Sequence, residues 1–110
     1  MDGWLVKTDV EGNQLWAKTF GGGNDDEFNC VIPTKDGGYL AAGSTGNYPA
    51  GYGWLVKMDA GGNQLWAKTF VWGNESEFSS VIPATDGGYL AAGESSSSGG
   101  RYGWLVKVTP

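Results

Sequence analysis

The chain has 110 residues, of which 20 are glycine and 6 are tryptophan, and it carries a net charge of −5 with no histidine. High glycine together with aromatic and β-branched residues favours turns and short strands over helices. With only 7 Lys plus Arg, a nucleic-acid partner is disfavoured, because such binding requires basic side chains that neutralise phosphates.

A long motif recurs along the chain. GWLVK-x-D-x-x-GNQLWAKTF runs from Gly3 to Phe20, returns at Gly53–Phe70, and its first five letters appear again at Gly103–Lys107. Aligning positions 3–52 with 53–102 gives 31 identities in 50 without a gap. The copies begin 50 residues apart, and a repeat period of this length indicates a solenoid, a propeller or an array.

No apolar run reaches the roughly 18–20 residues that span a bilayer, so no membrane partner is expected. The residues after Met1 do not form a basic and apolar leader, so no signal peptide is predicted.

Four strands are predicted in each unit, and no helix longer than a turn. GWLVK at Gly3–Lys7 is apolar on both faces, so it should be covered from both sides. QLWAKTF at Gln14–Phe20 carries lysine and threonine, which mark an exposed edge strand. EFNCVIPT at Glu27–Thr34 leads through an Asp-Gly-Gly hairpin turn into YLAAG at Tyr39–Gly43, whose small residues suit close backbone approach.

The proline late in EFNCVIPT, Pro33 in one unit and Pro83 in the other, lacks a backbone donor. It should therefore lie at a bulge, a strand end or an unpaired edge. We number the four strands of a unit with EFNCVIPT first, YLAAG second, GWLVK third and QLWAKTF fourth. In this order the chain supplies strands three and four, then one to four, then one to three.

An all-β fold follows, a β-propeller whose blades are four antiparallel strands, with half a blade at 3–23, a full blade at 24–73 and three-quarters of a blade at 74–110. Two repeats cannot close a ring that typically has four to eight blades, and an open end exposes apolar surface. We therefore expect homo-oligomerisation, with three or four chains. Both ends carry the third strand, so one copy is displaced, or a junction holds five strands, or the chain is part of a longer array.

The pattern WLVKxDxxGNQLWAKTFGG…DGGYLAAG resembles a repeat of large bacterial and archaeal surface or secreted proteins that is understood as a propeller blade. The resemblance implies the propeller fold and an extracellular or cell-surface location. It implies no activity, since fold does not define function. The near-identity of the units suits a recent duplication, or an engineered or excised two-repeat module.

Candidate sites are few. Asp25, Asp26 and Glu27, echoed by Glu75 and Glu77, are better explained as a solvated acidic loop than as a calcium site, because their spacing matches no EF-hand. Asp36 and Asp86 are expected to be turn residues that accept hydrogen bonds from backbone amides. The single cysteine, Cys30, is expected to be a small half-buried strand residue. No catalytic residue, metal or cofactor is predicted.

Loop aromatic residues are the candidate ligand-binding residues. Trp72 stands where the first unit has Gly22, and a loop tryptophan stacks on sugar rings or fills a pocket between subunits. Tyr48, Tyr52 and Tyr102 lie in or beside the other variable loop. The remaining tryptophans recur with the repeat and are predicted to pack within blades; they are Trp4, Trp16, Trp54, Trp66 and Trp104.

The sequence therefore predicts a non-enzymatic, self-assembling repeat module that serves as a structural or interaction scaffold. The alternative is a glycan-binding, lectin-like propeller that uses the loop aromatic residues. An enzyme is disfavoured, because the chain lacks the groups that acid–base or nucleophilic chemistry usually needs.

Overall fold

The computed structural model describes residues 2–21, 25–46, 51–71, 73, 75–97 and 100–109, and this part of the chain is all-β and antiparallel, as predicted. Its strands are β1 (Gly3–Thr8), β2 (Gln14–Phe20), β3 (Asp26–Pro33), β4 (Tyr39–Thr45), β5 (Tyr52–Met58), β6 (Gln64–Phe70), β7 (Glu75–Pro83), β8 (Tyr89–Ser97) and β9 (Gly100–Val108). No helix in the described ranges is long and apolar enough to cross a membrane.

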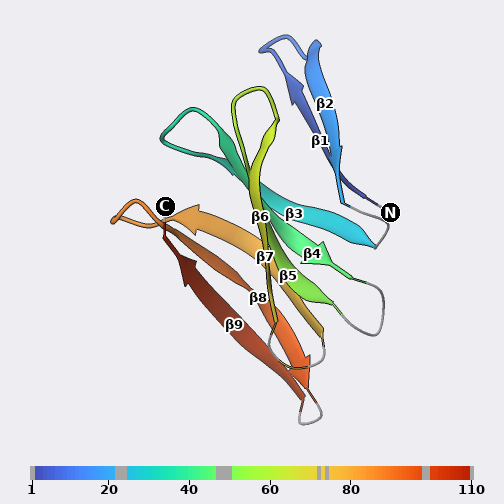
Figure 1. Cartoon of the computed structure of the whole chain (residues 1–110), viewed down its shortest axis with the longest axis vertical. Coiled ribbons are helices and arrows are strands. Elements are labelled where there is room, and N and C mark those ends of the chain that lie inside the picture. Colours follow the sequence, from blue (N-terminus) through green and yellow to red (C-terminus); the bar gives the residue numbers. More distant parts are fainter. Residues whose placement is uncertain are drawn as a thin grey trace.

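The strands form three sheets that follow one another along the chain (Figure 1). The first sheet pairs β1 with β2, the middle sheet has the order β3-β4-β5-β6, and the third sheet has the order β7-β8-β9. In Figure 1 the first and third sheets lie at opposite ends, with the middle sheet between them. The radius of gyration is 14.2 Å, above the value of about 13 Å for a compact domain of this length. The chain is therefore slightly less compact than a typical domain of this length.

The two units repeat not only in sequence but also in register. Val6 lies opposite Ala17 in the first sheet, and Val56 lies opposite Ala67 in the middle sheet. The edge strands β3 and β7 both shift register after a phenylalanine, at Phe28 and at Phe78. Pro33 and Pro83 are the last residues of these edge strands, which confirms the predicted position of the prolines.

Each sheet has two faces, and one residue of the GWLVK strand identifies each face. We call the face that carries Leu5, Leu55 or Leu105 the front face, and the face that carries Trp4, Trp54 or Trp104 the back face. Side chains alternate between faces along a strand, so these residues mark opposite sides of equivalent strands. The front face of each sheet covers the back face of the next.

Aromatic pairs show that the two contacts between sheets are built in the same way. Phe28 stacks on Trp54 with ring centroids 4.8 Å apart, and Phe20 of the first sheet meets Phe28 edge-on at 5.7 Å. The corresponding distances are 4.9 Å for Phe78 on Trp104 and 5.9 Å for Phe70 on Phe78. Offset and edge-on aromatic pairs of this kind add to the stabilisation from burial.

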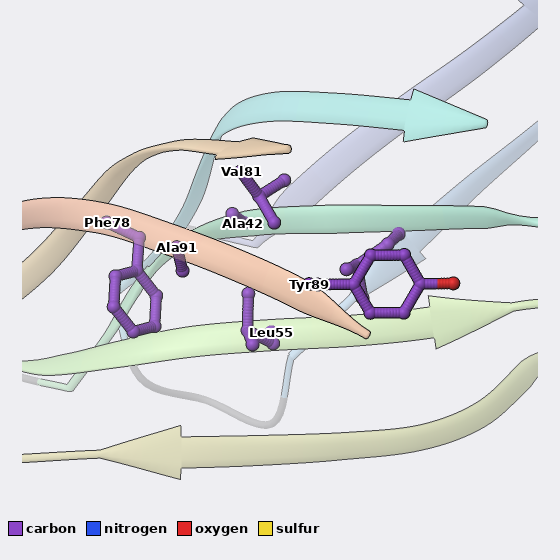
Figure 2. Close-up of a cluster of buried hydrophobic side chains, with 7 residues drawn as sticks. Ala42, Leu55, Phe78, Val81, Tyr89 and Ala91 are labelled. Atoms are coloured by element: carbon purple, nitrogen blue, oxygen red, sulfur yellow. The ribbon is translucent and has the colours of Figure 1, made fainter. Parts of the chain in front are cut away.

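The larger core lies between the middle and third sheets. Figure 2 shows Phe78, Tyr89 and Ala91 of the third sheet gathered against Ala42 and Leu55 of the middle sheet. Trp104 and Val106 of β9 pack against this cluster and are partly buried. A second core between the first and middle sheets contains Trp54, Val56 and Met58.

Glycine permits the close approach of strands that the YLAAG motif predicts. A Cβ atom at Gly43 would collide with the backbone of Glu27, and one at Gly93 would collide with the backbone of Glu77. The hairpin turns use glycine differently, because Gly37 and Gly87 have φ values of 90° and 92° that L-residues rarely adopt.

Candidate functional site

The repeat gives the protein an internal reference, because identical residues occur in the middle of the stack and at its ends. Leu55 on the front face of the middle sheet is 0% exposed, whereas Leu105 at the same position of the third sheet is 66% exposed. Ile82 on β7 shares this front face and is 53% exposed. The third sheet therefore ends the stack with an uncovered apolar face.

The opposite end of the stack is the back face of the first sheet. Trp4 is 68% exposed there, whereas Trp54 is 5% exposed at the equivalent position. The prediction that every recurring tryptophan packs within the fold is therefore wrong for Trp4. The reason is positional, since no sheet precedes the first sheet to cover its back face.

A further uncovered position lies on the back face of the middle sheet itself. Val31 on β3 is 46% exposed, whereas its counterpart Val81 on β7 is 2% exposed. The first sheet consists of β1 and β2 alone. It meets Phe28 of β3 and lies beside Val31, but it has no counterparts of β3 and β4, the strands that pack over Val81. Four exposed apolar residues therefore lie on sheet faces that have no neighbouring strands over them: Trp4, Val31, Ile82 and Leu105.

The Asp-Gly-Gly turns hold paired charges. Asp36 Oδ1 accepts a hydrogen bond from Gly38 N at 3.1 Å, and Asp86 Oδ1 accepts one from Gly88 N at 3.0 Å, which confirms the predicted turn role. The sequence reasoning missed their second role, in which Asp36 pairs with the buried Lys57 at 2.9 Å and Asp86 pairs with the exposed Lys107. Hydrogen bonds from Thr34 and Lys57 hold the pKa of Asp36 far below its ordinary value.

A cleft of about 510 Å³ lies between these two turns. Its walls include Pro33, Pro83 and Tyr89, and the Asp36–Lys57 pair lies at its rim. Thr34 and Lys35 of one turn and Gly87 and Gly88 of the other also line the cleft, which therefore lies between the two repeat units.

The acidic residues are not uniformly solvated, contrary to prediction. Asp26 is buried and accepts a hydrogen bond from Thr45 Oγ1. Its counterpart Ser76 is also buried, and its Oγ lies 3.1 Å from Oγ of Ser95, within hydrogen-bond distance. Burial and the nearby charge of Glu27 raise the pKa of Glu77. In the described part of the chain no three His, Cys, Asp or Glu side chains form a group that could hold a metal ion.

The predicted ligand-binding aromatic residues are not brought together as one described site. Trp72 and Tyr48 lie outside the described residues. Tyr52 and Tyr102 are exposed at equivalent positions of β5 and β9, opposite Thr45 and Ser95. Tyr102 borders a shallow groove of about 330 Å³ beside the Glu94–Arg101 ion pair.

Cys30 is half-buried on β3, as predicted for a small strand residue.

No protein-family model and no curated protein matches the chain. The resemblance to propeller repeats therefore remains a prediction from the motif. The signal that could have located the end faces was present in the sequence, since it lies in counting which strands lack a neighbour.

Proposed function

We propose that the protein is a non-enzymatic scaffold that assembles with copies of itself into a β-propeller ring. The observation that carries the proposal is the contrast between Leu55 and Leu105, which share the GWLVK context. Leu55 has a following sheet over it and β6 beside it, whereas Leu105 has neither. Burying large apolar side chains contributes roughly 1.5–3 kcal/mol each. Exposed apolar side chains that share one face, as Ile82 and Leu105 do, favour association.

A second copy of the chain fits this face, because the chain already packs a front face of this repeat against a back face of the same repeat. The front face of the middle sheet, with Leu40 and Leu55, is covered by a back face of the same repeat. The third sheet presents the same front-face residues at Leu90 and Leu105. The contact is head-to-tail, so it produces a ring if the rotation closes and a filament if it does not.

Light scattering tests the proposal directly. We expect a molar mass of three or four chains, and a stable monomer at all concentrations would contradict it. Leu105→Asp should reduce the mass to that of one chain, because it places a charge on the proposed contact. Leu65→Asp is the matched control, since Leu15 and Leu65 are each 57% exposed, so their exposure does not depend on the end of the stack.

Glycan binding is the second candidate, favoured by the exposed ring of Tyr102 beside a carboxylate and a guanidinium. An aromatic face stacks on a sugar ring, while Glu94 and Arg101 offer acceptors and donors to its hydroxyls. A glycan array tests this function. Binding that Tyr102→Ala abolishes, with the oligomer mass unchanged, supports it, and an array with no bound glycan rejects it.

A further inference from the structure

Two geometries bring the ends of neighbouring chains together. In one, the first sheet of a second copy lies over the third sheet as an additional layer. In the other, the third sheet of one copy and the first sheet of the next join edge to edge as a single sheet. The two geometries differ in what covers Val31 and in whether Trp4 is part of the contact.

Val31 distinguishes between them. Its counterpart Val81 is buried because β3 and β4 of the middle sheet lie over it, with Ile32 and Leu40 in the same cluster. An additional layer made of β1 and β2 brings no counterparts of β3 and β4 over Val31 and leaves it exposed to water. A joined sheet carries β7 and β8 of one copy over β3 of the next, so it buries Val31 and Ile82 in one step.

A joined sheet has one strand too many, because β1 and β9 both carry GWLVK. Building on the proposed self-assembly, we propose that β9 of one copy replaces β1 of the next copy beside β2. The sheet β7-β8-β9 is then completed by β2 of the second copy. Val106 lies opposite Ala17 of that copy, in the register that Val6–Ala17 and Val56–Ala67 already show.

The strand that stays is β9, because it has more partners. It pairs with β8 over nine residues, and its Arg101 and Lys107 form ion pairs with Glu94 and Asp86. Tyr102 at its start matches Tyr52 of the complete middle sheet, whereas β1 has Asp2 at this position. β1 spans six residues and pairs with β2 alone. Its release therefore breaks one strand pair, which β9 restores with the same residues.

Trp4→Asp separates the two geometries in the full chain. Trp4 is exposed within one chain, so the variant should fold. In the additional-layer geometry Trp4 lies in the contact, and a charge there would weaken association tenfold or more, about 1.4 kcal/mol or above. In the joined sheet β1 is released, so we expect a change of less than about threefold. A tenfold loss would overturn the exchange of strands.

Disulfide trapping tests the register. In a Cys30→Ser background, Val106→Cys with Ala17→Cys should link different chains on oxidation, because opposed residues in antiparallel strands have Cα atoms about 4.5–5.5 Å apart, within disulfide range. The matched control is Val6→Cys with Ala17→Cys, which links within a chain only while β1 remains in place.

We expect covalently linked chains from the first pair and little linkage from the second at assembling concentrations. An oligomer that links positions 6 and 17 within each chain, and not 106 to 17, would reject the strand exchange and leave self-assembly intact. A protein that scatters light as a monomer at every concentration would reject both proposals.

Discussion

At the scale of single residues, the two Asp–Lys pairs show how position in the stack changes the value of an identical interaction. Lys57 is buried and lies between Asp36 and the carbonyl of Met58, whereas Lys107 is exposed at the outer face of the third sheet. A buried charge that loses its partner is strongly destabilising, while a solvated one is not. The aspartates themselves are exposed in both pairs.

Asp36→Asn should therefore lower the melting temperature more than Asp86→Asn does. The pKa of Asp36 is depressed in the folded state, so its contribution is present above the unfolded value of about 3.9 and is lost as the pH falls through the folded value. The difference between Asp36→Asn and the unmodified protein should shrink below pH 4. Thermal unfolding between pH 2.5 and 7 measures this, and equal losses from the two aspartates would contradict it.

At the scale of strands, GWLVK shows how far sequence alone can reach. Its successive Trp, Leu and Val residues, apolar on both faces, predict a strand at all three positions, and β1, β5 and β9 contain it. The prediction that the strand is covered on both sides is correct for β5 alone. Burial depends on which sheets precede and follow, and five identical residues carry no information about their neighbours.

The same limit explains the errors at single residues. The acidic loop was expected to be solvated because its residues are charged, yet Asp26 is buried where β3 meets Thr45 of β4. That contact depends on strand register, which the loop sequence does not encode. By contrast, Pro33 and Gly43 were placed correctly, because their positions follow from local backbone chemistry.

Glycine at the start of GWLVK provides a test of strand context. A Cβ at Gly53 would lie 2.8 Å from the rings of Phe78 and Trp104, whereas one at Gly103 meets nothing within 4 Å. Gly53→Ala should destabilise the chain by about 1–3 kcal/mol through overpacking. Gly103→Ala should be neutral or stabilising by less than about 1 kcal/mol, because alanine restricts the unfolded chain.

Denaturant unfolding at low protein concentration measures both variants as single chains. At assembling concentrations Gly103→Ala acquires a cost, because in the joined sheet Gly103 occupies the place of Gly3, where a Cβ would lie 2.8 Å from Phe28. Weaker association with unchanged single-chain stability is the expected signature. A variant that assembles as well as the unmodified protein would place the junction elsewhere.

At the scale of the whole molecule, the open stack combines uncovered apolar faces with a net charge of −5. The faces favour association, and the like charges of neighbouring chains oppose it at a distance. Screening shortens the reach of that repulsion from about 30 Å at 0.01 M salt to about 8 Å at 0.15 M. Added salt should therefore lower the dissociation constant of the assembly, the opposite of its effect on a contact between unlike charges.

Sedimentation or light scattering across this salt range measures the effect, with NaCl and KCl compared to separate screening from binding of a particular ion. Moving the pH from 7 toward the isoelectric value of about 4.4 should act in the same direction, because it removes net charge. A dissociation constant that rises with salt would mean that ion pairs between chains hold the junction. The proposed burial of Val31 and Ile82 between chains would then not be its principal source of stability.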